Sequence, residues 1–340
     1  MTEIPRPSEA VQALDRSLSA DLDRLREQGL YHALRVLESP QGHEVTIAGQ
    51  RLINLSSNNY LGLNTHPRLV DAAVEGARKW GAGTGAVRTI AGTQSVHQEL
   101  EARLAAFKRT QAALVFQSGY TVNVGVLSSL LEEGDVVVSD KLNHASIIDG
   151  IRLTKADRIL YEHCDLDDAE RALAQAQAKG YRRILLVTDG VFSMDGDIAP
   201  LPGLVERAER HGAAVMVDDA HATGVLGDHG RGSTDHFGLH GRVALNIGTL
   251  SKAVGVVGGY VAASQTPITP VMCGEAPIAT QLSDLLMERG VFAQAIGFPT
   301  VPLGKARVRT IVTATHTGEE LDRALDAFAD AGRRLGLLRA

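Results

Sequence analysis

The chain has 340 residues, of which 44% are hydrophobic and 22% charged, and a formal net charge of -6 at pH 7. This length accommodates a large domain and a smaller one, and the negative charge gives no reason to expect nucleic acid or an anionic membrane as a partner. No apolar run approaches a membrane span and the first residues lack a signal-peptide core, so we expect a cytoplasmic protein. Cys164 and Cys273 lack metal-ligand spacing and suit a reducing compartment, and we expect no metal site.

The sequence of residues 1–55 predicts an N-terminal arm followed by a hairpin. Leucines recur at helical spacing between Ser8 and Arg35, which favours an amphipathic helix that packs on the body or on a neighbouring molecule. An alternating stretch from His43 to Leu55 turns at residues 48–50, as in a β-hairpin. A polar loop follows, and Pro67 begins the next predicted helix.

Helices and short apolar strands alternate from Val96 to Tyr260. The predicted strands cover residues 112–116, 136–138, 184–188 and 214–217 and the apolar stretch before Lys252. The predicted helices cover residues 96–104, a segment after residue 119, and residues 146–153, 166–178 and 202–212. Strands separated by such helices need crossover connections, so we predict an α/β domain with a mostly parallel sheet over residues 56–264. Residues 265–340 mix three predicted strands with two helices, which indicates a small α+β domain.

A glycine-rich stretch, G-A-G-T-G-A-V-R-T-I-A-G-T, runs from Gly81 to Thr93 and carries one cation, Arg88. It lacks the spacing of a dinucleotide-binding fingerprint. A flexible connection and an anion-binding or subunit-contact loop both remain open.

Polar residues follow the strands of the predicted large domain. Because ligands bind beyond the carboxyl ends of parallel strands, we expect these residues to lie together. They form the segments Gln117–Tyr120, Asn143–Ser146, Asp189–Gly196, Asp218–His221 and Thr249–Lys252. A lone lysine is most often solvated, but a desolvated one loses its proton near neutral pH and acts as a nucleophile or base. The gathering of these segments favours the second interpretation for Lys252.

The set fits pyridoxal 5'-phosphate (PLP), which needs an amine, an acid for its ring nitrogen, a planar partner and a phosphate site. The expected groups are Lys252 as the amine, Asp218 as the acid, His144 against the ring, the amides of Gly119 and Tyr120 with Thr249 at the phosphate, and His221 at the phenolic oxygen. Each residue alone has an ordinary structural explanation, such as a turn histidine or a helix cap. Their convergence predicts a cofactor site.

Several motifs resemble the α-oxoamine synthases, fold-type-I PLP enzymes that condense an amino acid with an acyl-CoA. They are N-N-Y-L-G-L, V-R-T-I-A-G-T, N-H-A-S-I-I-D-G, D-G-V-F-S-M-D-G-D, V-D-D-A-H-A-T-G-V-L-G, T-L-S-K-A and P-T-V-P-x-G-x-A-R-x-R. The resemblance implies a homodimer with its active site at the subunit interface. N-H-A-S-I-I-D-G is closer to 2-amino-3-ketobutyrate:CoA ligase (glycine C-acetyltransferase), with glycine and acetyl-CoA as substrates, than to 8-amino-7-oxononanoate synthase, which uses alanine and a pimeloyl thioester. A dual-function enzyme is a further alternative.

The resemblance also implies residue roles. Arg309 would hold the substrate carboxylate with help from Asn58, and Ser193 would bond near the cofactor oxygen. Lys252 would remove the Cα proton, and His221 or His144 would stabilise the oxyanion that forms when the carbanion attacks the thioester.

One departure from the family lies after Ser264, where a segment of several dozen residues is missing and the chain continues directly at Gln265. The missing segment is either a true deletion or residues omitted from the sequence. We expect an abnormal junction there, such as a chain break or a displaced small domain. The competing functions are transamination and an inactive subunit that serves in assembly.

Overall fold

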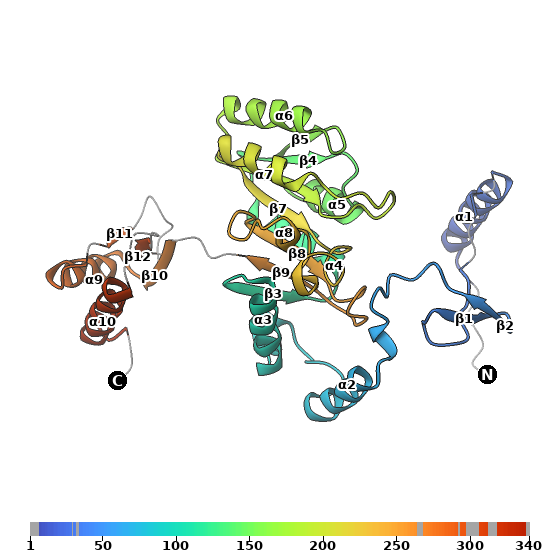
Figure 1. Ribbon diagram of the computed structural model, residues 1–340, viewed down its shortest axis with the longest axis horizontal. Coiled ribbons are helices and arrows are strands. Elements are labelled where there is room, and N and C mark those ends of the chain that lie inside the picture. Colours follow the sequence, from blue (N-terminus) through green and yellow to red (C-terminus); the bar gives the residue numbers. More distant parts are fainter. Residues whose placement is uncertain are drawn as a thin grey trace.

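The computed structural model describes residues 7–28, 30–31, 34–263, 268–291, 293–296, 306–311 and 318–337. Its centre is a seven-stranded sheet in the order β3-β9-β8-β7-β6-β4-β5 (Figure 1). The strands are β3 (Ala112–Phe116), β4 (Asp135–Asp140), β5 (Asp157–Tyr161), β6 (Arg183–Asp189), β7 (Ala214–Asp218), β8 (Leu245–Thr249) and β9 (Gly259–Ala263). Only β9 pairs antiparallel with its neighbours, so the prediction of a mostly parallel sheet is confirmed.

Helices cover both faces of this sheet because its central strands are apolar on both sides. Val136 and Val138 pack with residues of α6 and α7, whereas Val137 between them packs with residues of α4 and α5. This alternation follows the two-residue period of a strand. The helices are α3 (Ser95–Lys108), α4 (Gly119–Leu130), α5 (Ala145–Arg152), α6 (Leu166–Lys179), α7 (Leu201–Arg210) and α8 (Ser233–His236), with a short 3-10 turn at Asp228–Gly230.

The sequence analysis missed β5, the edge strand between α5 and α6. Its residues read D-R-I-L-Y, and the charged pair Asp157-Arg158 hides the apolar pattern of so short a strand. Two helices were therefore expected in succession. The other predicted strands of this sheet match the structure to within about two residues at their ends.

The helix α1 (Glu9–Glu27) and the antiparallel hairpin of β1 (Glu44–Ile47) and β2 (Gln50–Ile53) lie at one end of the molecule (Figure 1). A 3-10 turn at Leu63–Thr65, α2 (Pro67–Trp80) and a π-helical turn at Arg88–Gly92 follow, and α2 lies below the large sheet in the same view. The hairpin and both helices were predicted, although α1 ends at Glu27 rather than near Arg35. Neither α1 nor α2 has a buried residue, so their apolar sides face solvent.

The C-terminal elements form a small sheet at the opposite end of the molecule (Figure 1). Strand β12 (Ala306–Ile311) lies between β10 (Ile268–Gly274) and β11 (Gln294–Ile296), antiparallel to both, and the helices are α9 (Ala276–Glu288) and α10 (Gly318–Arg334). A separate apolar core includes Leu282, Leu286 and Val308. The domain limits after residues 55 and 264 stay predictions, and the expected abnormal junction at Ser264-Gln265 lies outside the described residues.

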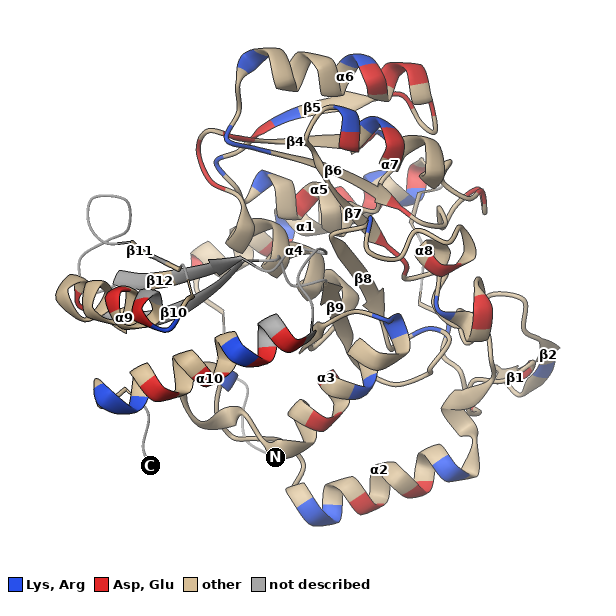
Figure 2. Ribbon diagram, turned by 60° about the vertical axis from the view of Figure 1, so that its left-hand side comes forward, with Lys and Arg blue, Asp and Glu red and all other residues tan. Residues whose placement is uncertain are grey.

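Charged residues of both signs alternate along α2, α6 and α10 (Figure 2). Across the described residues, no helix is both long enough and apolar enough to cross a membrane.

Candidate active site

The carboxyl ends of β4, β6, β7 and β8 and the start of α4 surround a cavity of about 190 Å³. Eight of the ten residues predicted for the site line it: Gly119, Tyr120, His144, Ser193, Asp218, His221, Thr249 and Lys252. The gathering at one sheet edge follows from the parallel strands. The contacts that each of these residues makes indicate what it can do in the cavity.

Lys252 lies just after β8, and its amine faces a histidine. The Nζ atom is 2.6 Å from Nε2 of His221. Burial lowers the pKa of the Lys252 amine, although the nearby carboxylates of Asp218 and Asp189 act in the opposite direction. The result is an amine that gives up its proton more readily than a solvated lysine.

His221 is the centre of a short chain of hydrogen bonds. Burial, the charge of Lys252 and the proximity of His144 lower the pKa of His221 to about 4, so its ring is neutral at pH 7. Because the Lys252 amine donates to Nε2, the ring proton lies on Nδ1 and is donated to the Tyr60 hydroxyl oxygen 2.6 Å away. The Tyr60 hydroxyl also lies 3.4 Å from the side-chain oxygen of Asn58.

Asp218, at the end of β7, is buried with both carboxylate oxygens engaged. Oδ1 accepts the backbone N–H of Ala220 at 2.9 Å, and Oδ2 accepts the side-chain amide of Asn123 at 2.6 Å. Beside it in register on β6 lies Asp189. Burial and the neighbouring charge of Asp218 raise the pKa of Asp189 well above its usual range.

His144 caps the start of α5 from inside the cavity. Its Nδ1 accepts the backbone N–H of Ser146 at 3.2 Å and lies 2.7 Å from the Ser146 hydroxyl. Its own backbone N–H donates to Asp189 at 3.1 Å. With Nδ1 accepting, the ring proton lies on Nε2.

The first turn of α4 offers an anion site. Ser118 caps the helix by accepting the Thr121 N–H at 3.2 Å, which leaves the N–H groups of Gly119 and Tyr120 without intrahelical acceptors. A Cβ atom at Gly119 would lie 3.2 Å from Cβ of Thr249, so only glycine allows this close approach without displacement. The hydroxyls of Thr249 and Ser251 are 2.7 Å apart beside this turn.

Two predicted residues are not among those that line the cavity. Asn58 is exposed and is connected to the site only through Tyr60. Arg309 lies on β12 opposite Pro270 and Gln294, and its side chain is outside the described residues. The Tyr120 side chain, whose backbone was predicted to bind phosphate, donates its hydroxyl to Asp149 at 3.1 Å.

Arg88, whose role the sequence left open, forms an ion pair with Glu101 of α3 through both terminal nitrogens. Glu101 also accepts the backbone N–H of Val115 at 3.0 Å. This cation therefore ties the glycine-rich stretch to the edge of the large sheet.

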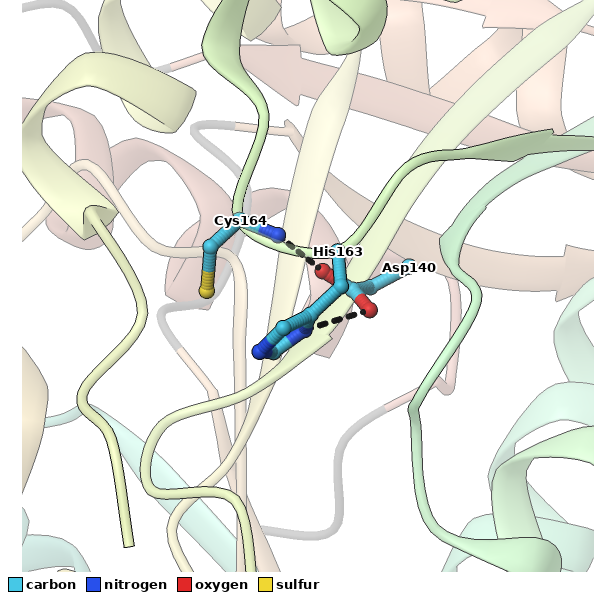
Figure 3. Close-up of side chains that lie close together, drawn as sticks. All are labelled: Asp140, His163 and Cys164. Carbon is cyan, nitrogen blue, oxygen red and sulfur yellow. Dashed lines mark hydrogen bonds and ion pairs between the residues drawn. The ribbon is translucent and has the colours of Figure 1, made fainter. Parts of the chain in front are cut away.

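A second polar cluster consists of Asp140, His163 and Cys164 (Figure 3). Nδ1 of His163 is 3.1 Å from Asp140, and Nε2 is 2.7 Å from Asp197. Direct contacts of this length leave no space for an ion between the paired atoms. Burial and the charge of Asp140 raise the pKa of the Cys164 thiol to about 12, which makes it a poor metal ligand at neutral pH. We interpret the cluster as a clamp on the loop that carries Ser193.

Asn123 is a contact residue that the sequence analysis missed, whereas Ser146 and Tyr60 were named only within a segment and a motif, without a role. Asn123 lies inside a helix and Tyr60 in a loop before the sheet begins, so neither belongs to the segments that follow the strands of the large sheet. The available signal for Asn123 was a lone polar residue in the apolar run V-N-V-G-V-L.

The chain resembles characterised enzymes over nearly its whole length. The aminotransferase class I and II family model matches residues 50–269. The 8-amino-7-oxononanoate synthase 1 of Bacillus subtilis (strain 168) is 50% identical over 94% of this chain and 98% of its own length. The 8-amino-7-oxononanoate synthase of Symbiobacterium thermophilum is 50% identical over 96% of this chain and 100% of its own length. The solved serine palmitoyltransferase of S. paucimobilis, with bound PLP, has a TM-score of 0.69 and 28% identity over 95% of this chain and 98% of its own.

These relatives correct one expectation and leave another open. They do not support the glycine C-acetyltransferase assignment and favour the alternative, 8-amino-7-oxononanoate synthase. The alignment with the Bacillus subtilis enzyme runs over 387 residues, more than the 340 of the chain, so that relative carries residues without a counterpart here. A missing segment between residues 264 and 265 stays a prediction.

Proposed function

The chain belongs to the aminotransferase class I and II family and is a PLP-dependent α-oxoamine synthase, and from this premise we propose that it makes 8-amino-7-oxononanoate from alanine and a pimeloyl thioester. The observation that carries the proposal is the 50% identity to enzymes of that name over almost the entire chain. The cavity supports it with a lysine, an acid and a histidine suited to the cofactor.

The structure of the product identifies the two substrates. Alanine supplies the carbon that bears the amine and the terminal methyl group, and the pimeloyl group supplies the remaining carbons, including the ketone. One C–C bond forms between the alanine Cα and the acyl carbonyl carbon, and the C–S bond breaks to release a thiol. The alanine carboxylate leaves as CO₂, so the atoms balance.

Bound PLP supplies a carbonyl carbon that captures an amine and a ring that withdraws electrons from the neighbouring carbon. Lys252 is the residue we assign to hold it and to move the proton at the alanine Cα. Its lowered pKa favours a free amine, and the neutral His221 at 2.6 Å keeps that amine directed into the cavity.

The remaining cavity residues orient and polarise the cofactor. Asp218 would hold a proton on the ring nitrogen, and the imidazole of His144 would lie against the ring. The free N–H groups of Gly119 and Tyr120, with the hydroxyl of Thr249, suit a phosphate dianion. Ser193 and His221 would bond near the phenolic oxygen.

We assign recognition of the alanine carboxylate to Arg309, assisted by Asn58. A guanidinium binds a carboxylate through two parallel hydrogen bonds and would fix the Cα–H bond for removal of its proton. This part of the proposal follows from the motif P-T-V-P-x-G-x-A-R-x-R and from N-N-Y-L-G-L.

A homodimer with the site at its interface is also part of the proposal. Four leucines of α1, Leu14, Leu18, Leu22 and Leu25, are 37–58% exposed on one side of the helix. Such a stripe is unfavourable in water, and a second copy of the chain is the partner that we propose covers it.

The decisive assay compares substrates. Purified protein with PLP should release thiol from pimeloyl-CoA only when alanine is present, and mass spectrometry should detect 8-amino-7-oxononanoate. Lys252→Ala should abolish both signals. Faster turnover of glycine with acetyl-CoA would contradict the proposed substrates, and amine transfer to a keto acid without thiol release would indicate transamination. Failure to bind PLP would leave only the inactive assembly subunit.

A further inference from the structure

Asn123 is a buried amide in the second turn of α4, and only 1% of its surface is exposed. Its single NH₂ group donates to Asp218 at 2.6 Å and to the Ser146 hydroxyl at 2.9 Å. We propose that Asn123 is a positioning residue that fixes, through these two bonds, both the acid at the cofactor ring nitrogen and the histidine that lies against the ring. The inference rests on the proposed PLP site and adds a residue to it.

The first branch fixes Asp218. Asn123 occupies one lone pair of Oδ2 and the Ala220 N–H occupies one of Oδ1, so the carboxylate cannot rotate about its terminal bond without losing both. Two of its four lone-pair sites remain for a ring N–H. Hydrogen bonds to an ionised acceptor are short and strong, which fits the 2.6 Å separation.

The second branch reaches His144 through Ser146. The Ser146 oxygen accepts a hydrogen bond from the Asn123 amide. Its own O–H is therefore free to donate to Nδ1 of His144 at 2.7 Å. The backbone N–H of Ser146 donates to the same nitrogen. The imidazole is thereby held as the tautomer with its proton on Nε2 and with its plane fixed.

The orientation of the Asn123 amide follows from its neighbours. If the amide were turned over, its oxygen would face the Asp218 carboxylate, where two acceptors would repel each other. In the observed orientation the amide oxygen is buried without a hydrogen-bond partner. An unpaired buried acceptor destabilises the fold, so an apolar side chain would serve stability better at this position. The two donated bonds are what an apolar residue could not provide.

The test compares Asn123→Ala with Ser146→Ala and with a control. Asn246 on β8 is a second buried asparagine, 3% exposed, that bonds Thr234 and the Ala262 carbonyl and does not line the cavity. Asn246→Ala removes the same buried amide group from a strand of the large sheet. For each full-length variant we would measure unfolding of the apoprotein, the PLP dissociation constant, and exchange of the alanine Cα proton with deuterium.

We expect Asn123→Ala to weaken PLP binding and to slow the exchange by about 10- to 100-fold, the loss of one hydrogen bond to a charged group. Ser146→Ala keeps the bond to Asp218, so PLP affinity should stay within about threefold while exchange slows by about tenfold. Asn246→Ala should lower the stability of the apoprotein but leave the PLP affinity and the exchange rate unchanged.

One contrary result is that Asn123→Ala keeps the PLP affinity and the exchange rate of the wild type while its apoprotein loses stability to the same extent as the Asn246→Ala control. That result would show that the residue is merely structural. If Asn123→Ala fails to fold, Ser146→Ala is the deciding variant. An unchanged exchange rate in Ser146→Ala would show that the bond from Ser146 does not position His144, and this would overturn the inference. If wild-type protein binds PLP but exchanges no alanine proton, the proposed substrate fails. In that case the dependence of PLP affinity on Asn123 still tests the inference.

Discussion

Lys108 and Asp219 form an ion pair in the interior, with side chains 2% and 0% exposed and 3.0 Å between Nζ and Oδ2. Burial alone would lower the pKa of Lys108, but the charge and hydrogen bond of Asp219, together with Tyr260 and Asp235, outweigh it and raise the pKa of the lysine above its usual value. Ser233 donates to the same carboxylate through its N–H and hydroxyl, and Lys108 also donates to the Arg231 carbonyl. The pair therefore anchors residues 231–233 beneath the segment that carries Asp218 and His221.

We predict that Lys108→Met destabilises the protein by about 3–5 kcal/mol, because it leaves the Asp219 carboxylate buried and uncompensated. The double variant Lys108→Met with Asp219→Asn should recover most of this loss, since it removes the charge and keeps an acceptor for Ser233. Urea unfolding of the apoprotein at pH 7, followed by circular dichroism, gives the comparison. Arg242→Met is the control, because its ion pair with Glu209 is 44% and 46% exposed and should contribute less than about 1 kcal/mol.

A loss below about 1 kcal/mol in Lys108→Met, or a double variant as unstable as the single one, would refute this reasoning. Gly232→Ala offers an independent check. At a φ of 104°, its new Cβ would lie 2.1 Å from Oδ2 of Asp219 and 2.9 Å from Nζ of Lys108. It should therefore disrupt the same pair without changing any charge.

Three further predictions concern the cavity and its surroundings. Asp218→Asn should still bind PLP but lose turnover by orders of magnitude, because an amide cannot hold the ring proton, and near-normal turnover would remove Asp218 from its role. Gly119→Ala should weaken PLP and inorganic phosphate binding together, since its Cβ would crowd Thr249 at 3.2 Å; unchanged phosphate binding would place the anion elsewhere. The carboxylates of Asp140 and Asp197 outweigh burial and raise the pKa of His163. Its stabilisation is therefore complete below about pH 6.5 and declines as pH rises through the raised value, so His163→Gln should destabilise more at pH 6 than at pH 9 in urea unfolding.

The part of the site that follows the strands was predictable from the sequence. His144, Asp218 and Lys252 each come within a few residues of an apolar strand, and parallel strands bring their carboxyl ends to one edge. Asn123 was not predictable in this way, because a residue within a helix is brought to the cavity only by how that helix packs on the sheet. Its contacts with Asp218 and Ser146 span 95 and 23 residues of sequence, and no local sequence pattern indicates contacts over such a separation.

The same geometry explains why the motifs favoured a pair of substrates that the relatives do not support. N-H-A-S-I-I-D-G contains His144, which lines the cavity and is proposed to lie against the cofactor ring, and Ser146, which bonds both His144 and Asn123. A residue that handles the ring serves alanine, glycine or serine equally, since all three react at a carbon bound next to that ring. Serine palmitoyltransferase shares the fold with this chain at 28% identity while its name records a different amino acid and acyl group. Substrate choice must therefore depend on residues beyond the strand ends, and a motif from the strand ends identifies the chemistry without identifying the substrate.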